Sequence, residues 1–327
     1  MCGIAGYVIG HNQDQTSVPS IDKMLRALEH RGPDDCGWVV EEGFAMGMQR
    51  LSIIDIDGGS QPMQSACGRF VIVMNGEIFN FRELRKGLEE QGVSLRTSSD
   101  TEVALEVLAN RGLDAANEFN GMFAIALLDQ LQRKIHLIRD RFGVKPLYVG
   151  LGSGSFVFAS EVTAVHESGL IQESINDLGV WDYLTYRFVP TSRSIWNGIK
   201  KVAPAHIVSI DLDTCQIEQA RYWKPPRRPF RNKATLEDDD SVFKSLLEDS
   251  VSLRFQADVP VGVALSGGLD SSVIAAIASK DRAKLPTFAV GFEGDDKSSE
   301  LSYAARVAEF LGTDHVEISV SRDAFFD

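Results

Sequence analysis

The chain opens with Met1-Cys2-Gly3-Ile4-Ala5-Gly6, and the position of its cysteine decides how we interpret the rest of the sequence. Removal of Met1 would place a thiol and a free α-amine together on Cys2. Such an amine has a pKa of about 7.7–8.0, so near neutral pH part of it can accept the thiol proton. Because the thiolate is the nucleophile, Cys2 would then be a self-contained centre for acyl transfer. We expect Gly3 and Gly6 to keep side-chain bulk away from an approaching substrate. An inert cysteine is the alternative that this stretch alone leaves open.

Length and composition bound the class of protein. The chain has 327 residues, enough for two domains with separate cores. Hydrophobic residues make up 44% and charged residues 24%, as in soluble globular proteins. The formal charge of −13 disfavours a nucleic acid or an anionic membrane surface as a partner. The sequence has no apolar run of transmembrane length and no basic region before its first apolar stretch, so we expect a cytoplasmic protein.

The four cysteines, Cys2, Cys36, Cys67 and Cys215, form no C-x-x-C pair and have no histidines at zinc spacing. So few cysteines in a chain of this length do not make a disulfide framework. We therefore predict no metal site and treat the last three cysteines as ordinary thiols.

Hydrophobic periodicity predicts a first domain over residues 1–220. Helical spacing occurs in residues 20–30, 80–91 and 101–109. Apolar runs of strand length occur at residues 50–56, 70–74, 123–128, 135–138, 147–149 and 156–159. Many strands with a few amphipathic helices indicate a layered α+β domain with stacked β-sheets.

A composition change follows the first domain. Residues 224–233 are basic and proline-rich, and residues 237–240 are acidic. We interpret residues 221–240 as a linker, although a surface loop of one larger domain is the alternative.

Residues 241–327 predict a second domain that begins a parallel sheet. Helical patterns cover residues 241–255, 273–277 and 299–311, and strand patterns cover residues 259–265, 287–292 and 315–320. This alternation is typical of parallel strands joined by helical crossovers, here a partial α/β sheet.

The first strand of that domain runs into Ser266-Gly267-Gly268-Leu269-Asp270-Ser271-Ser272. Adjacent glycines let several backbone N–H groups point into one concavity, and a helix N-terminus adds a positive dipole. The loop lacks the lysine of a Walker A motif. We interpret it as a pyrophosphate cradle that holds the β- and γ-phosphates as a leaving group and suits attack at the α-phosphate, which gives an adenylate, and a plain glycine turn is the alternative.

Seven motifs together resemble glutamine-hydrolysing asparagine synthetase of the bacterial type. They are Cys2-Gly3-Ile4, His30-Arg31-Gly32-Pro33-Asp34, Arg50-Leu51-Ser52-Ile53, Asn75-Gly76-Glu77, Ser99-Asp100-Thr101-Glu102, Arg139-Asp140-Arg141-Phe142-Gly143 and the loop just described. The resemblance spans nearly the whole chain in order. It implies an N-terminal-nucleophile domain, the class II glutamine amidotransferase fold, followed by part of an ATP-pyrophosphatase domain.

For the first domain, the resemblance implies a nucleophile at Cys2 and an oxyanion hole made by the Asn75 amide and the Gly76 N–H. It places Arg50 on the α-carboxylate of glutamine, and Asp100 and Glu77 near its α-ammonium and amide. The implied glutamine pocket comprises Arg50, Leu51, Ser52, Ile53, Ile54, Asn75, Gly76, Glu77 and Asp100.

For the second domain, the resemblance implies an ATP site with Mg²⁺ as Mg-ATP. Its residues are Leu265, Ser266, Gly267, Gly268, Leu269, Asp270, Ser271, Ser272 and Val290. Ammonia released at Cys2 would aminate a β-aspartyl adenylate made from aspartate and ATP, giving asparagine, AMP and pyrophosphate.

One departure from the family pattern concerns the end of the chain. A Ser-Gly-Glu-Gly-Ser-Asp-Glu loop that completes the aspartate site in the family does not occur here, so we expect a truncated product or a fragment. Alternatives are a glutaminase that acts alone or on another acceptor, and a non-catalytic partner of a full-length homologue. A homodimer is also compatible, because dimers are common in the family.

Overall fold

A computed structural model describes residues 1–10, 20–172, 174–226, 236–293 and 300–321, with the side chains of residues 236–239 left out. The chain divides into two units, Met1–Arg227 and Arg228–Asp327. Residues 227–235 of the expected linker lie outside the described residues, and its last five residues, 236–240, already belong to a helix.

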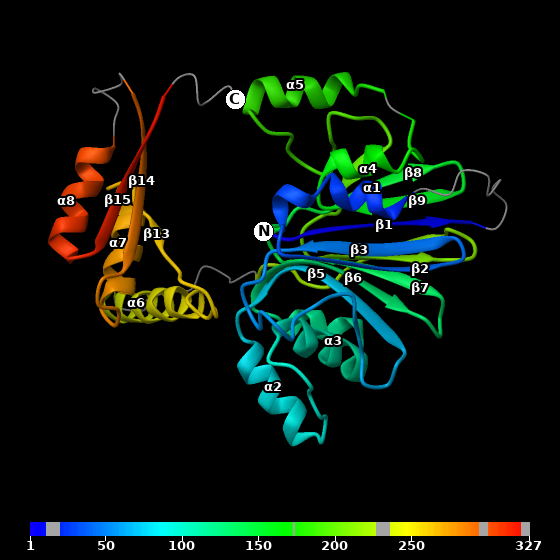
Figure 1. The fold of residues 1–327 in the computed structure, drawn as a ribbon, viewed down its shortest axis with the longest axis horizontal. Coiled ribbons are helices and arrows are strands. Elements are labelled where there is room, and N and C mark those ends of the chain that lie inside the picture. The colour runs from blue at the N-terminus through cyan, green and yellow to red at the C-terminus, as the bar shows by residue number, and fades with distance from the viewer. Residues whose placement is uncertain (11–19, 173, 227–235, 294–299, 322–327) are drawn as a thin grey trace. The chain divides into compact units, whose positions relative to one another are not determined.

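Two six-stranded antiparallel sheets form the first unit (Figure 1). The first sheet has the order β10-β8-β9-β1-β3-β2, with β1 Gly3–Ile9, β2 Asp35–Glu41, β3 Phe44–Arg50, β8 Tyr148–Gly152, β9 Ser155–Ala159 and β10 Ile199–Lys201. The second has the order β12-β11-β7-β6-β5-β4, with β4 Met63–Gln64, β5 Phe70–Ile78, β6 Gly121–Asp129, β7 Lys134–Arg139, β11 His206–Asp211 and β12 Ile217–Arg221.

The sheets stack face to face, with helices on both outer faces (Figure 1). Alternate residues of one strand therefore enter different cores. In β5, Val71 and Val73 pack between the sheets, whereas Ile72 packs against α2 and α3. In β1, Tyr7 faces α1 and α4. The helices are α1 Ile21–Arg26, α2 Phe81–Glu90, α3 Asp100–Arg111, α4 Val162–Glu167 and α5 Asp177–Tyr186, with 3₁₀ turns Glu29–Arg31 and Leu113–Glu118.

The first sheet positions Cys2 at the end of a central strand. Strand β1 lies between β9 and β3, and Gly3 pairs with Gln49 of β3. Arg50 and Leu51 therefore continue the chain beside Cys2. The Ser160 hydroxyl accepts the N–H of Ile4 at 2.9 Å, which fixes the start of β1.

The predicted strand at residues 50–56 is wrong. Strand β3 ends at Arg50, and residues 51–62 form a loop. The Arg50 guanidinium donates to the carbonyls of Ile54, Asp55 and Ile56 at 3.2, 2.8 and 3.0 Å. Side-chain hydrogen bonds of this kind compete with strand pairing and bend the backbone into turns.

The predicted strand at residues 70–74 is too short. Strand β5 continues to Ile78, and Asn75, Gly76 and Glu77 pair with Ala124, Phe123 and Met122 of β6. The polar residues that suggested a turn are thus held within the ladder by a partner strand, which is a tertiary effect that local sequence does not reveal.

The second unit is a parallel three-stranded sheet with helices. Its elements are α6 Leu236–Leu253, β13 Val263–Ala264, α7 Leu269–Ser279, β14 Pro286–Phe292, α8 Leu301–Leu311 and β15 Asp314–Val320, in the strand order β13-β14-β15. The predicted strand at residues 259–265 is too long, because only Val263 and Ala264 pair with β14. Pro260, which has no N–H to donate, precedes this short edge strand.

Only one face of this small sheet is buried. Thr287 and Ala289 of β14 are buried, whereas Phe288, Val290 and Phe292 are exposed. No helix in the described residues is both long and apolar enough to span a bilayer.

Candidate functional site

A cavity of about 360 Å³ lies in the first unit, where the N-terminus, the end of β3 and the second half of β5 meet. It gathers residues far apart in sequence. The predicted site residues that line it are Cys2, Arg50, Leu51, Ile53, Ile54, Asn75, Gly76, Glu77 and Asp100.

Cys2 is held by backbone and side-chain contacts at the cavity. Its sulfur accepts the N–H of Leu51 at 3.4 Å and lies 3.6 Å from the Leu51 carbonyl. Its carbonyl accepts from Nε of Arg31 at 2.9 Å, and Arg31 pairs with Glu161 at 2.6 Å. Burial raises the pKa of the Cys2 thiol, and the Leu51 N–H opposes this. Burial also lowers the pKa of the terminal amine, which the structure places on Met1.

Asn75 brings a buried amide without a partner to the cavity. Its side chain is 0% exposed, and neither Oδ1 nor Nδ2 has a hydrogen-bond partner among the described residues. Buried polar atoms are nearly always hydrogen-bonded, so an orphaned amide in a cavity wall indicates a place for a ligand. A Cβ on the neighbouring Gly76 would lie 2.2 Å from the carbonyl oxygen of Met122, so only glycine fits there. The pair therefore offers fixed donors at the end of a rigid strand.

The cavity wall carries charges of both signs. Arg50 is buried at one side. At the other side Asp100 accepts the N–H of Ile78 at 2.9 Å, and burial raises its pKa to about 7, with Glu77 adding to the effect. A cation and carboxylates in one cavity suit a zwitterion such as an amino acid.

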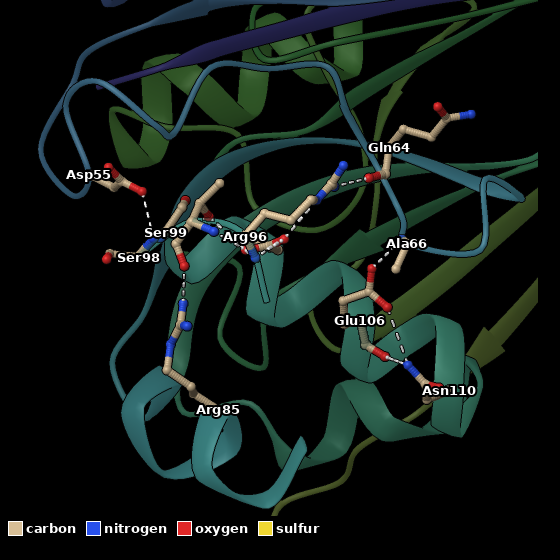
Figure 2. Close-up of polar contacts among 11 residues, drawn as sticks. Asp55, Gln64, Ala66, Arg85, Arg96, Ser98, Ser99, Glu106 and Asn110 are labelled. Atoms are coloured by element: carbon tan, nitrogen blue, oxygen red, sulfur yellow. Dashed lines mark hydrogen bonds and ion pairs between the residues drawn. The ribbon is translucent and has the colours of Figure 1, made fainter. Parts of the chain in front are cut away.

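A network of buried acids supports this wall from behind (Figure 2). Glu102 accepts N–H groups of Arg96 at 2.9 Å and of Thr97 at 2.7 Å, while Glu106 accepts the N–H of Ala66 at 2.6 Å. Asp55 of the loop after β3 accepts the N–H of Ser98 at 2.7 Å. The first turn of α3, which carries Asp100, is thereby tied to the segment that precedes the helix, and that segment is tied in turn to the loop after β3.

Ser52 is the one residue of the predicted glutamine pocket that does not line the cavity. Its N–H donates to the Asp34 carboxylate at 2.8 Å, and it faces a neighbouring hollow with Asp34 and Ser60. The reason is that residues 51–62 form a loop. The regular alternation of side chains along a strand therefore does not set the direction of the Ser52 side chain. Asp34, from the His30–Asp34 motif, thus holds the loop rather than the cavity.

The expectation for Gly3 and Gly6 is also wrong. Neither lines the cavity. A Cβ on Gly3 would lie 2.8 Å from Cβ of Leu28, and one on Gly6 would lie 2.4 Å from the Phe158 ring. Both glycines serve close packing around β1 rather than access of a substrate.

In the second unit, the Ser266–Ser272 loop has the form of an anion cradle. Gly267 adopts a φ of +75°, and Gly268 caps the N-terminus of α7. The Ser266 and Ser271 hydroxyls lie 3.0 Å apart, and the Gly268 N–H donates to the Ser266 hydroxyl at 3.3 Å. Oγ of Ser272 is buried without a partner among the described residues. The free N–H groups of a helix start and an orphaned hydroxyl fit a phosphate ligand.

The remaining predicted ATP residues lie next to this loop or are exposed on it. The Leu265 N–H donates to the carbonyl of Phe288 at 2.7 Å, so Val290 lies two residues further along β14, level with the loop. Leu269 and Asp270 are exposed. A cavity of about 590 Å³ between α7 and α8 is lined by Gly267 and Ser272, and none of the other predicted ATP residues borders it.

Comparison with known proteins decides the family. A family model described as "Glutamine amidotransferase domain" matches residues 1–223. The chain belongs to this family. A second model, described as "Asparagine synthase", matches residues 242–327. The recognition made from the seven motifs is therefore confirmed.

Relatives of this amidotransferase include longer curated proteins. A putative asparagine synthetase [glutamine-hydrolyzing] 2 of Methanocaldococcus jannaschii is 35% identical, and the match covers 96% of this chain and 64% of that protein. Asparagine synthetase [glutamine-hydrolyzing] 1 of Bacillus subtilis is 34% identical over 100% of this chain and 51% of that protein. The chain thus spans between about half and two thirds of the length of these relatives.

A solved structure is similar in fold. It is titled glutamine phosphoribosylpyrophosphate amidotransferase from B. subtilis complexed with ADP and GMP, and it matches 97% of this chain and 65% of that chain at a TM-score of 0.51. Its sequence identity of 17% restricts the likeness to the fold. Together with the stacked antiparallel sheets and the parallel strands of the second unit, it confirms the predicted fold class.

The sequence interpretation missed Lys145, Gln61 and Met122, which also line the cavity at Cys2. Gln61 donates to Thr101 at 3.1 Å and accepts the N–H of Met74 at 2.7 Å, so it braces the wall. Lys145 is buried beside Cys2. The only signal for it was its place two residues after the Arg139–Gly143 motif.

Proposed function

We propose that the first unit hydrolyses glutamine to glutamate and ammonia, with Cys2 as the nucleophile. The observation that carries this proposal is the orphaned Asn75 amide, which lies in the same cavity as Cys2, Arg50 and the Asp100 carboxyl. The family match over residues 1–223 supports it.

In this mechanism Arg50 binds the α-carboxylate of glutamine, and Asp100 and Glu77 bind its α-ammonium, which leaves the side-chain amide at Cys2. Removal of Met1 frees the amine of Cys2, which takes the thiol proton. The thiolate then attacks the amide carbon and forms a C–S bond. Negative charge passes to the amide oxygen, where the Asn75 amide and the Gly76 N–H stabilise it.

Collapse of that intermediate breaks the C–N bond. The terminal ammonium of Cys2 returns its proton to the leaving nitrogen, ammonia departs, and a γ-glutamyl thioester remains on Cys2. Water attacks the thioester carbon while the neutral Cys2 amine takes one of its protons. The C–S bond then breaks, that proton passes to the sulfur, and glutamate leaves. The same donors stabilise the second oxyanion, so one site serves both steps.

The complete protein acts, we propose, as a glutamine-dependent asparagine synthetase, a ligase of asparagine biosynthesis. ATP and aspartate give β-aspartyl-AMP and pyrophosphate, and ammonia displaces AMP to give asparagine. The names of the relatives and the match of residues 242–327 support this assignment. The helix start and the orphaned Ser272 hydroxyl fit the phosphates of ATP. The Asp270 carboxylate at the same helix start would hold Mg²⁺, which neutralises phosphate charge when bound.

The organisation and setting that we propose follow from the same assignment. Residues 1–220 form the glutaminase domain, residues 221–240 the linker and residues 241–327 the N-terminal part of the synthetase domain. The partners are the small molecules glutamine, aspartate and ATP. We place the enzyme in the cytoplasm, as a homodimer.

Covalent labelling tests the glutaminase proposal. Intact mass spectrometry should show loss of Met1, and an electrophilic glutamine analogue should add once, on Cys2. Excess glutamine should protect the residue. Cys36 and Cys67 are exposed and serve as internal comparisons that the analogue should spare. Labelling of those two cysteines with an unlabelled Cys2 in folded protein would contradict the proposal.

Product analysis tests the synthetase proposal on the complete protein. Aspartate-dependent formation of AMP from ATP, measured by chromatography, should accompany asparagine formation when the complete synthetase half is present. An Asp270→Asn variant should lose AMP formation while glutamine hydrolysis remains, because the two chemistries use separate sites. Loss of both activities in that variant would contradict the assignment.

A further inference from the structure

Lys145 is a buried cation in the glutamine cavity for which the proposed mechanism has no step. Its side chain belongs to a residue that is 6% exposed, and it lines the same cavity as Met1, Cys2 and Glu77. Burying an ammonium costs free energy unless nearby negative charges or hydrogen bonds compensate its charge. The Glu77 carboxylate and the Cys2 sulfur line the same cavity and act on this ammonium, so its charge is directed at the cavity.

The loop that carries Lys145 is fixed by two buried side chains. The Asp140 carboxylate accepts the N–H groups of Phe142, Val144 and Lys145 at 3.1, 2.9 and 3.0 Å. Arg139 donates to the Lys145 carbonyl at 2.9 Å. The N–H and the carbonyl of Lys145 are therefore both hydrogen-bonded. The Arg139–Gly143 motif thus fixes the backbone from which the lysine side chain extends.

Two other cations near Cys2 also make fixed contacts. Arg31 pairs with Glu161 and with the Cys2 carbonyl, and Arg50 donates to three loop carbonyls. The groups that face Lys145 and Cys2 from the surrounding elements are Arg31, Asp34, Arg50, Glu77, Asp100 and Asp140. Burial lowers the pKa of Lys145, while Glu77 and the Cys2 sulfur favour its charged form.

We propose that Lys145 is a positioning residue that sets the pH at which Cys2 becomes a nucleophile. Its ammonium repels a proton on the amine of processed Cys2 and attracts negative charge on the sulfur. Both effects favour the neutral amine beside a thiolate, which is the reactive pair. This inference rests on the proposed glutaminase function and names a residue that the function had not used.

The sign of the expected pH effect follows directly. Without the positive charge, the pKa values of the amine and of the thiol both rise. A higher pH is then needed to reach the reactive pair. In Lys145→Met the midpoint of Cys2 alkylation by iodoacetamide should move up by about one pH unit, a roughly tenfold slower reaction on the acid side. Lys145→Arg keeps the charge and should restore the wild-type midpoint.

The experiment follows the N-terminal peptide by mass spectrometry between pH 5 and 9.5, alongside kcat/KM for glutamine. Lys201→Met is the matched control, because this partly buried lysine of β10 donates to the Val189 carbonyl and does not line the cavity. It should leave the midpoint unchanged. The acid limb of kcat/KM should move with the alkylation midpoint in Lys145→Met.

The outcomes separate this inference from the function beneath it. If wild-type protein is alkylated at Cys2 but hydrolyses no glutamine, the proposed function is wrong. The shift of the alkylation midpoint in Lys145→Met still tests the role of Lys145 in that case. An unchanged midpoint in folded Lys145→Met overturns the inference, even if its rate falls at every pH. Lys145→Gln provides a second neutral variant. If neither neutral variant folds, the lysine serves folding, and the inference is overturned.

Discussion

At the scale of single residues, the orphaned amide of Asn75 offers the clearest test of catalysis. Asn75→Ala should lower kcat for glutamine hydrolysis by about 10²–10³-fold with little change in KM, because the amide stabilises charge that develops after binding. Steady-state kinetics with an ammonia assay measures this. Asn110→Ala removes an exposed amide that bonds to Glu106 outside the cavity and should leave kcat unchanged. A raised KM at wild-type kcat would instead assign Asn75 to ground-state binding.

The Asp100 carboxyl should make both glutamine binding and folding stability depend on pH. Burial raises its pKa to about 7, with Glu77 adding to the effect, so its contribution to folding is complete below the unfolded pKa and is lost as pH rises through 7. Asp100→Asn keeps an acceptor for the Ile78 N–H without the charge. It should therefore raise the melting temperature more at pH 8 than at pH 4.5.

The same substitution should weaken glutamine binding. In the wild type, KM should fall as pH rises through about 7, because the carboxylate binds the α-ammonium. In Asp100→Asn this dependence should disappear. Thermal melts and KM measured over pH 5–8.5 check both effects, and an equal melting shift at both pH values would show that the carboxyl is not the titrating group.

At the scale of elements, the network behind α3 holds the wall of the cavity. The Glu102 side chain is 1% exposed and accepts N–H groups of Arg96 and Thr97. Burial opposes its ionisation, but these bonds keep the pKa of Glu102 below its ordinary value, so its stabilisation is lost as pH falls through that pKa. Glu102→Gln would place an NH₂ group, itself a donor, against the N–H groups of Arg96 and Thr97, and some of these bonds would be lost. We expect a loss of about 1–3 kcal/mol in unfolding free energy and a higher KM for glutamine.

Urea unfolding and steady-state kinetics measure these two effects. Glu90→Gln is the control, since Glu90 is exposed on α2 and lies 4.0 Å from Lys86. An exposed pair at that distance contributes little to stability. Glu102→Gln with normal stability but a raised KM would mean that the network orients the wall without stabilising the fold.

The elements also show what the sequence could reveal. Apolar runs at residues 123–128 and 135–138 predicted β6 and β7, because buried strands need continuous hydrophobic side chains. Strand β3 was missed because its residues 44–50 contain glycine, methionine and polar side chains in place of β-branched residues. Strand β2 was missed because its apolar run, Trp38-Val39-Val40, is only three residues long. The false strand at residues 50–56 depends on Arg50, whose side chain bonds to backbone carbonyls only once the loop has folded.

Some residues of the candidate site could be predicted from the sequence and others could not. Cys2, Arg50, Asn75 and Asp100 were found from motifs, and the structure brings them into one cavity. Lys145 could not be found in this way, because its proximity to Cys2 arises from the Asp140 and Arg139 contacts that turn the chain across the molecule. Residues that act through tertiary placement leave no local pattern.

At the scale of the whole molecule, each unit keeps its own core. Three hydrophobic clusters lie within residues 1–227, and a fourth lies within the second unit. The second unit is smaller and leaves Phe288, Val290, Phe292, Val316 and Ile318 exposed on its strands. Small domains with little buried area are marginally stable. We therefore expect two calorimetric transitions, the lower one belonging to the second unit and accompanied by binding of a hydrophobic dye.

Paired core substitutions assign those transitions. Leu285→Ala, in the core of the second unit, should lower only the first transition, whereas Leu127→Ala, in the first unit, should lower only the second. Truncation of a buried leucine costs about 2–5 kcal/mol, which is several degrees in a melt. Because the two changes are chemically identical, each variant controls for the other. A single transition that both variants shift would mean that the units unfold together, and the cavity at Cys2 would then depend on the second unit for its stability.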